Sequence, residues 1–347
     1  MHGTVAASEG ATLNGDTTME GRPQGQKWVV PAHVSVYDPA AASTAGSYNV
    51  TTNNSGDFQL GGLDMGSFNV GVKGSHTLRS VVSEVSLAAG NNPVDFGTLP
   101  EGDANNDNVV DLLDVSAVQA AFNTTTGDPA FNPNCDFNED GSVDISDVDL
   151  LALNFGLVGD DPGGAPGPPI PCSARPATMA HLSALTAAED PIVVELDPSH
   201  LQVAPGGVVA LKLNVDSGTR AVDGVQLYLN FDPDVLAVTD AQGNPRGWIG
   251  NAGKFDEVIT NHANNATGQI DFVATALQSA KPSGDFRVTT IYFKVLRDTT
   301  LTRIRFATTE PRFTRVAVGG EYPPVQLLAA QLDVNVRKVH LPVVLKQ

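Results

Sequence analysis

Residues 102–114 (GDANNDNVVDLLD) and 135–147 (CDFNEDGSVDISD) repeat one pattern of acidic and amide side chains. In each copy these side chains stand at positions 1, 3, 5, 9 and 12 of a twelve-residue stretch that starts at Asp103 or Asp136. Short Asp and Asn side chains at alternate positions of a tight turn point inward. Such a set of oxygens suits a hard divalent cation, which takes six to eight oxygen ligands. The pattern therefore predicts metal binding rather than acid–base catalysis.

The spacing is that of an EF-hand calcium loop, in which position 7 adds a backbone carbonyl and position 12 a closing carboxylate. Position 6, where the chain turns sharply, is Asn108 in the first copy and Gly141 in the second, and both residues tolerate a positive φ. We expect two calcium ions. The predicted ligands are Asp103, Asn105, Asp107, Val109, Asp111 and Asp114 in the first loop, and Asp136, Asn138, Asp140, Ser142, Asp144 and Asp147 in the second.

The repeat has an offset of 33 residues (136 − 103) and continues beyond the loops. Apolar residues at spacings i, i+3 and i+7 follow each loop and predict one face of a helix. The segments that precede the loops, FGTLPEG and DPAFNPNC, contain helix breakers, so no entering helix is expected. The recurring apolar residues are Val115, Val118 and Phe122 in the first copy and Val148, Leu151 and Phe155 in the second.

A duplicated calcium loop that keeps only its exiting helix resembles a type I dockerin, over residues 102–156. The resemblance implies that calcium folds the module and that its helix faces bind a cohesin. It also implies that specificity lies at loop positions 10 and 11, and the difference between Leu113 and Ser146 argues against binding in two orientations. The candidate partner-binding residues are Leu112, Leu113, Ile145 and Ser146.

Residues 1–100 alternate apolar and polar side chains in short runs separated by turn residues, which predicts a β-sandwich. A pattern of glycine, phenylalanine and leucine in this region resembles the carboxypeptidase-regulatory, or transthyretin-like, β-sandwich. The resemblance implies a spacer module, with sugar or protein binding as the alternative. The pattern consists of Gly56, Phe58, Leu60, Leu63, Gly66 and Phe68. The predicted strands are Trp28–Val30, His33–Tyr37, Ser47–Thr52, Asp57–Leu60, Ser67–Lys73 and Val81–Leu87.

Residues 158–189 read as a Pro/Gly linker, and residues 190–337 return to about nine alternating strands, as in a two-sheet jelly roll. The phrases GVQLYLNFDPDVL, GQIDF and TTIYFKV resemble a cohesin in their order. A sugar-binding or purely structural sandwich is the alternative, although the aromatic residues form no obvious row. The tail, residues 338–347, could be a last strand or an exposed strand that pairs with a neighbour.

Charge and composition exclude several classes of function. The net charge is −19, and no Lys or Arg occurs between Ser80 and Ala174, so nucleic acid is not an expected partner. No apolar run is long enough to span a membrane, and no signal peptide is recognisable, so if the protein is exported we expect this sequence to be its mature form. Cys135 and Cys172 could form one disulfide or remain unpaired. No catalytic motif is found.

The sequence as a whole predicts a mainly β, multidomain protein: a sandwich at 1–100, a dockerin-like module at 101–157 and a cohesin-like sandwich at 190–337. The predicted function is non-catalytic, calcium-dependent assembly outside the cell or on its surface. The expected partners are cohesin or dockerin modules of other chains or of a second copy, in which case a filament could grow. A polysaccharide-binding adhesin and an accessory subunit docked on a separate enzyme scaffold are the alternatives.

Overall fold

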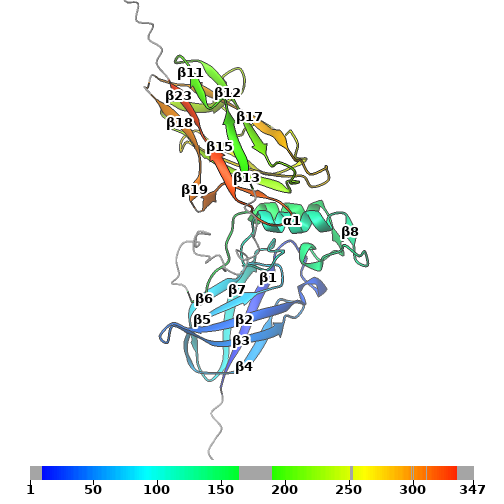
Figure 1. The fold of residues 1–347 in the computed structure, drawn as a ribbon. Coiled ribbons are helices and arrows are strands. Elements are labelled where there is room, and N and C mark those ends of the chain that lie inside the picture. Colours follow the sequence, from blue (N-terminus) through cyan, green and yellow to red (C-terminus); the bar gives the residue numbers. More distant parts are fainter. Residues whose placement is uncertain are drawn as a thin grey trace, which may run out of the picture. The chain divides into compact units, whose positions relative to one another are not determined.

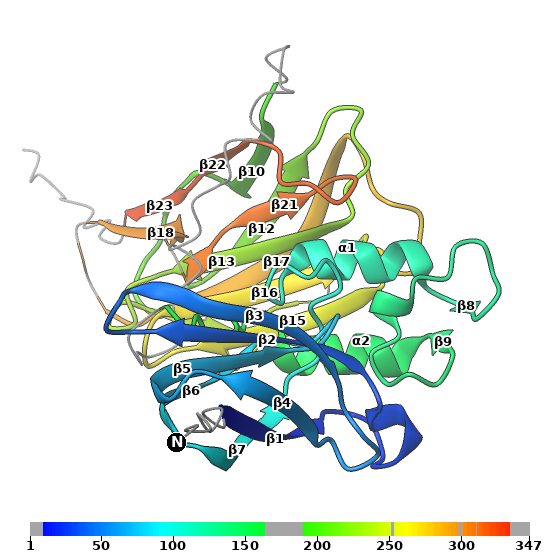
Figure 2. The same cartoon turned by 90° about the horizontal axis from the view of Figure 1, so that it is seen from below.

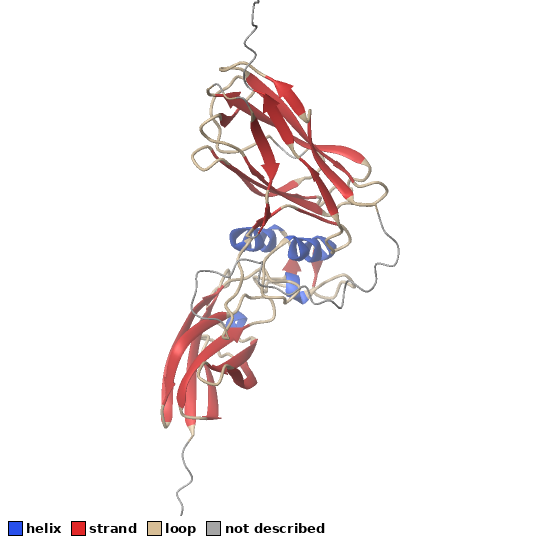
Figure 3. Ribbon diagram, turned by 60° about the vertical axis from the view of Figure 1, so that its left-hand side comes forward, coloured by secondary structure: helices blue, strands red, loops and turns tan. Residues whose placement is uncertain are grey.

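The computed structural model describes residues 10–163, 190–250, 253–297, 299, 301–309 and 311–333. Two compact units divide the chain, one formed by residues 1–178 and the other by residues 179–347. Strands dominate the described parts of both units, and both described α-helices belong to the first unit (Figures 1 and 3). The mainly β fold predicted from the sequence is confirmed.

The first unit contains a β-sandwich of two sheets. Strands β3-β2-β5-β6 form one sheet in that order, and β4-β1-β7 form the other, in which β1 and β7 run parallel. Alternate side chains point inward, so Leu13, Val34, Val70 and Phe96 lie in the core of the sandwich. The strands are β1 (Ala11–Met19), β2 (Pro31–Asp38), β3 (Ser43–Thr51), β4 (Phe58–Leu63), β5 (Gly66–Lys73), β6 (Ser80–Leu87) and β7 (Gly90–Leu99).

Strands β2 to β6 were predicted from the alternation, and their positions are confirmed within a few residues. The predicted strand at Trp28–Val30 is wrong, because Gln26–Trp28 form a short 3-10 helix (η1) in which Trp28 N donates to Gly25 O. Strands β1 and β7 escaped the sequence analysis. In β1 the inward positions include Gly15 and Thr17 along with apolar residues, and in β7 only Phe96 and Leu99 are buried, so neither run shows a clear alternation of large apolar residues.

A helical module follows the sandwich within the same unit. Helices α1 (Leu112–Ala121) and α2 (Ile145–Asn154) each begin at position 10 of an acidic loop, so that a helix follows each loop as predicted, and they pack against each other (Figure 2). A short 3-10 helix η2 (Pro133–Cys135), and not an α-helix, precedes the second loop. The absence of an entering α-helix before either loop is thus confirmed for the described residues 100–135.

The two halves of this module are interlocked through their backbones. Val110 N donates to Leu157 O in the segment after α2, and Asn123 N, after α1, donates to Val143 O in the second loop. The second of these contacts extends into a pair of short strands. Each loop therefore depends on the other half of the repeat for its hydrogen bonds. The short strands are β8 (Thr124–Thr125) and β9 (Ser142–Val143).

The second unit is a β-sandwich with one sheet in the order β14-β17-β12-β10-β22 and another in the order β11-β23-β18-β13-β16-β15, where β21 also pairs with β13. The predicted phrases GVQLYLN, GQIDFVATA and FRVTTIYFKV supply β13, β16 and β17. The strands are β10 (Ile192–Asp197), β11 (His200–Gln202), β12 (Val208–Asp216), β13 (Gly224–Asn230), β14 (Leu236–Thr239), β15 (Glu257–Asn264), β16 (Gln269–Thr275), β17 (Asp285–Val295), β18 (Thr302–Phe306), β19 (Thr308–Thr309), β20 (Arg312–Phe313), β21 (Arg315–Ala317), β22 (Val325–Leu328) and β23 (Ala330–Asp333).

Two predicted segments lie largely or wholly outside the described residues: the Pro/Gly linker from residue 164 onward and the tail at 338–347. The core of the second unit is continuous between its two sheets and includes Leu211, Leu227, Phe272 and Phe293. A search of the described helices found none that combines the length and apolar character needed to cross a membrane.

Candidate metal centre

Both acidic loops fold in the same way. In the first loop, Asp103 at position 1 accepts hydrogen bonds from the backbone N–H groups of positions 5 and 6, at 2.9 and 2.7 Å. Asp136 makes the same two bonds in the second loop, at 3.0 and 2.9 Å. Residues at positions 4 and 6 have positive φ in both loops. The repeat in the sequence is therefore a repeat of backbone structure.

The amide side chains at position 3 and the carboxylates at position 5 shape the turn locally. Asn105 and Asn138 each accept from the N–H group two residues ahead, at 2.9 and 2.8 Å. Asp107 and Asp140 do the same, at 3.0 and 2.9 Å. Such Asx bonds span only two residues, so the sequence can specify them without help from the rest of the fold.

Positions 9 and 12 join the loops to the helices. Asp111 and Asp144 are the N-caps of α1 and α2, and they form capping boxes with Asp114 and Asp147. The position-12 carboxylates also reach back into their loops: Asp114 accepts from the N–H of position 3 at 3.1 Å, and Asp147 from the N–H of position 2 at 2.7 Å. Position 12 thus lies in the first helical turn, as predicted.

The negative charge of the buried carboxylates in both loops must be balanced by protons or by a cation. Asp103, Asp114, Asp136 and Asp147 are all buried. Burial, with repulsion from Asp111, raises the pKa of Asp114 to about 9, and burial raises that of Asp147 to about 6. Carboxyl groups in such surroundings take up protons unless a cation stabilises their ionised form. An all-oxygen donor set with buried carboxylates fits a hard cation such as calcium.

Within the described ranges, no group of three or more His, Cys, Asp or Glu side chains converges closely enough to hold a metal ion. The predicted shells draw part of their oxygens from other sources, namely the amides of Asn105 and Asn138 and the backbone carbonyls of Val109 and Ser142. The loops therefore supply the donors, while the convergence of those donors on two ions stays a prediction.

The positive charge nearest the first loop comes from the sandwich. Lys73, the last residue of β5, places its Nζ atom 2.6 Å from Oδ2 of Asp103, and both side chains are buried. Burial raises the pKa of Asp103, and the ammonium of Lys73 opposes this shift. The sequence analysis did not single out Lys73. Its one signal was the gap in basic residues from 80 to 174, which means that any protein cation must come from outside the module.

A second buried group ties the sandwich to the other loop. Arg22 is buried, and its guanidinium donates to Phe137 O (3.0 Å) and pairs with Glu139 (2.9 Å) and with the fully buried Glu101. Nδ1 of His76 lies 2.6 Å from the other carboxylate oxygen of Glu101. Sequence reasoning missed these residues too, because the pairs join positions as far apart as 22 and 137.

The candidate partner-binding residues differ in accessibility. Ile145 is 48% exposed and Ser146 is exposed, whereas Leu113 is half-buried and Leu112 is buried. Further along α2, Leu153 is 69% exposed. Helix α2 therefore presents apolar side chains to solvent, as a docking face would. The assignment of all four residues to a partner stays a prediction.

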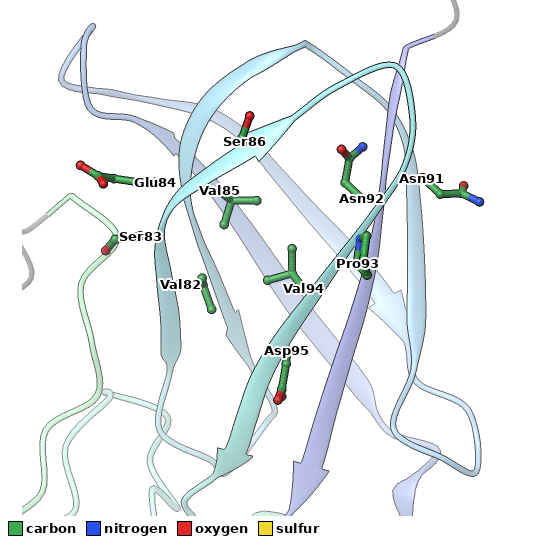
Figure 4. Close-up of a pocket in the computed structure, with 10 residues that line it drawn as sticks. All are labelled: Val82, Ser83, Glu84, Val85, Ser86, Asn91, Asn92, Pro93, Val94 and Asp95. Carbon is green, nitrogen blue, oxygen red and sulfur yellow. The ribbon is translucent and has the colours of Figure 1, made fainter.

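Neither the cleft of the sandwich nor the buried thiol adds a reactive site. A cleft of about 410 Å³ lies between the edge strands β6 and β7, where the sheets diverge, and Glu84 points away from it (Figure 4). Val82 and Val94 line it together with polar side chains. Cys135 is a free, fully buried thiol, and burial raises its pKa to about 12, so it is unreactive. Its predicted alternative partner, Cys172, lies outside the described residues.

Comparison with known proteins identifies two families along the chain. Residues 101–155 match the family model of the dockerin type I domain, and residues 194–314 match that of the cohesin domain. The dockerin and cohesin resemblances derived from the sequence are confirmed, and the transthyretin-like resemblance of residues 1–100 stays a prediction. The comparison with curated proteins gave no match.

Similar solved structures include cohesins and their complexes. An interface mutant of a type II cohesin–X–dockerin complex from Acetivibrio cellulolyticus is 22% identical, covering 43% of this chain and 98% of that chain, with a TM-score of 0.35. A type II cohesin domain from the cellulosome of the same organism is 19% identical. The match covers 41% of this chain and 94% of that chain, with a TM-score of 0.34. A type I cohesin–dockerin complex from Clostridium thermocellum is 10% identical. The match covers 42% of this chain and 100% of that chain, with a TM-score of 0.33.

Proposed function

We propose that this chain, which carries a type I dockerin domain followed by a cohesin domain, is a non-catalytic, calcium-dependent assembly protein of the cell exterior. Dockerin and cohesin domains are binding partners of one another, so one chain holds both halves of a docking pair. The observation that carries the calcium part of the proposal is the repeated loop, which buries a carboxylate at position 1 and another at position 12 in each copy.

Two calcium ions, one for each loop, are the cofactors of this proposal. A bound ion stabilises the ionised form of the buried carboxylates. Asp114 and Asp147 stand in the first turn of α1 and α2, so the ligands that complete each shell also fix the start of a docking helix. Extracellular EF-type sites have dissociation constants of roughly 0.1–1 mM, which calcium outside the cell fills and calcium in the cytosol does not.

We further propose that the partner is a second copy of the chain. A contact between the dockerin of one copy and the cohesin of the next is heterologous, because it joins two different surfaces. Heterologous contacts that do not close into a ring extend without limit, and a filament is the result. The exposed apolar residues of α2, Ile145 and Leu153, supply the dockerin side of this contact.

Negative-stain electron microscopy and light scattering of the purified chain, in calcium and in chelator, test this function. We expect filaments or large oligomers in calcium and monomers in chelator. Asp147→Asn removes a buried loop carboxylate and should abolish assembly, whereas the matched control Asp234→Asn changes an exposed residue of the second unit and should not. Monomers in both conditions contradict self-assembly, and a pull-down with cohesins and dockerins from the same source then identifies a different partner.

The alternative of a carbohydrate-binding adhesin finds less support in the second unit. Trp248 in this unit is 53% exposed, but Tyr228 is buried. The guanidinium carbon of Arg246 lies over the Trp248 ring, 5.2 Å from its centroid. Sugar-binding sandwiches present several exposed rings in one plane. Binding of the intact chain to a polysaccharide or glycan array, lost in Trp248→Ala, would favour the adhesin.

A further inference from the structure

The two acidic loops differ in the charge that faces their first carboxylate. In the first loop, Nζ of Lys73 lies 2.6 Å from Oδ2 of the fully buried Asp103. The Lys73 side chain is itself only 8% exposed and also donates to Thr77 O. The carboxylate and carbonyl partners of Lys73 thus replace the water that its buried side chain has lost.

The backbone of the sandwich holds the same loop at two further points. His76 O accepts a hydrogen bond from Asp103 N at 3.0 Å, and Arg79 N donates to Oδ1 of Asn108 at 2.8 Å. Both contacts come from the turn between β5 and β6, which starts directly after Lys73. Positions 1 and 6 of the first loop are therefore fixed from outside the loop.

The second loop lacks this arrangement. Asp136 is buried like Asp103, yet in the part of the chain that the structure describes it forms no ion pair with Lys or Arg. Arg22 and Lys27 approach this loop, but they bind the backbone carbonyls of positions 2 and 3, at 3.0 and 3.2 Å. Nδ1 of His76 lies 2.6 Å from Oε2 of Glu101.

We propose that Lys73 is a built-in counter-cation of the first loop and makes the two calcium sites unequal. The second loop binds calcium more tightly, and the first loop keeps its fold when calcium is removed. This inference rests on the calcium binding proposed above. A fixed ammonium beside a ligand carboxylate repels a divalent ion and lowers its affinity on the order of tenfold. The same ammonium neutralises Asp103 with or without calcium, so docking responds to calcium through the second loop.

Calcium titration of the full chain by calorimetry tests the inequality. We expect a tight and a weak site, with Asp147→Asn removing the tight site and Asp114→Asn the weak one. Lys73→Met should raise the affinity of the weak site on the order of tenfold. Lys27→Met is the matched control, since its ammonium binds a backbone carbonyl and not a carboxylate, and it should change neither site by more than about threefold.

The calcium-free state gives an independent readout. In chelator, Lys73→Met should lower the melting temperature of the first unit by roughly 10 °C, because it leaves Asp103 buried without its partner. Limited proteolysis of the unaltered chain in chelator should cut within residues 136–147 before residues 103–114. If Lys73→Met does not fold, calcium titration of Asp114→Asn and Asp147→Asn and the proteolysis of the unaltered chain still test whether the two loops are unequal.

Three outcomes overturn the inference. Two sites of equal affinity in the unaltered chain would do so, as would an unchanged weak site in Lys73→Met, or first cleavage within residues 103–114. Each of these leaves the calcium-dependent function standing. The absence of any calcium binding has a different meaning, because it overturns the proposed function and this inference together.

Discussion

The first and second acidic loops share their acidic and amide side chains at positions 1, 3, 5, 9 and 12, yet they differ at positions 2, 4 and 6 between those ligands. Position 2 is Ala104 in one loop and Phe137 in the other, and position 4 is Asn106 or Glu139. In the second loop these even positions contact the sandwich: the Phe137 ring lies 5.8 Å from that of His76, and Glu139 pairs with Arg22. The difference teaches that the acidic and amide ligand positions carry the repeat, while positions 2 and 4 adapt each copy to its neighbour.

The largest expected effect comes from Arg22→Met, which breaks the attachment of the second loop. It leaves the Glu101 carboxylate fully buried, with the His76 ring as its remaining side-chain partner among the described residues. Removing one member of a buried ion pair costs about 3–5 kcal/mol, so the melting temperature of the first unit should fall by roughly 10 °C in calcium and in chelator. Differential scanning calorimetry measures this.

Arg246→Met is the matched control, because Arg246 pairs with Asp240 at a partly exposed site of the second unit. Pairs of that kind contribute about 0–1 kcal/mol. Equal shifts in the two variants would show that the Arg22 network does not hold the second loop to the sandwich.

Phe137→Ala makes position 2 of the second loop identical to that of the first. Phe137 is fully buried, so truncation should cost about 3–4 kcal/mol through lost burial and a cavity. Urea unfolding followed by a probe of the first unit measures the loss. Phe137→Leu keeps most of the volume and should cost less than half as much. Similar losses in both variants would contradict a packing role for the ring.

The pH dependence of calcium binding should separate the loops. Both pKa values, about 9 for Asp114 and about 6 for Asp147, lie above the ordinary 3.8. The folded, calcium-free unit therefore holds protons that the unfolded chain has released, and its stability falls as the pH rises from about 4 to about 9. At pH 7 calcium must displace a proton from Asp114 but rarely from Asp147. The affinity of the first loop should rise up to about 100-fold between pH 7 and 9, and that of the second loop little.

Titrations of Asp147→Asn, which reports the first loop, and of Asp114→Asn, which reports the second, measure the two profiles. Parallel profiles would contradict the difference between the pKa of Asp114 and that of Asp147. Chemical denaturation of the chelated, unaltered chain at several pH values checks the direction of the stability change.

The smallest expected effect concerns position 6. Gly141 has φ of 91°, and an added Cβ would meet only Oγ1 of Thr126 at 3.3 Å, so Gly141→Ala should cost about 1 kcal/mol from backbone strain. At the same position of the first loop, Asn108 adopts φ of 72° and its side chain accepts from Arg79 N. Asn108→Gly should cost a similar amount through that lost bond. Thermal melts of both variants measure the costs, and a stabilised Asn108→Gly chain would show that the bond to Arg79 contributes nothing.

Local spacing made much of this protein predictable. Asn105 and Asn138 bond to N–H groups two residues away, and Asp111 and Asp144 cap helices that start at the next residue. Interactions over so few residues are encoded in the order of side chains, so the loops, both helices and the two family resemblances followed from the sequence. The alternation of large apolar residues likewise located most strands, but not β1, where small and polar residues are buried.

The sequence by itself determined where the oxygen donors stand and which segments form strands and helices. Only the tertiary structure decided which charges face those donors. Lys73 meets Asp103 across 30 residues and Arg22 meets the carbonyl of Phe137 across 115, and in both cases the contact exists because the folded sandwich brings β-strand ends to the loops. Electrostatic compensation depends on distance in space and on burial, neither of which can be read from the spacing of residues along a chain.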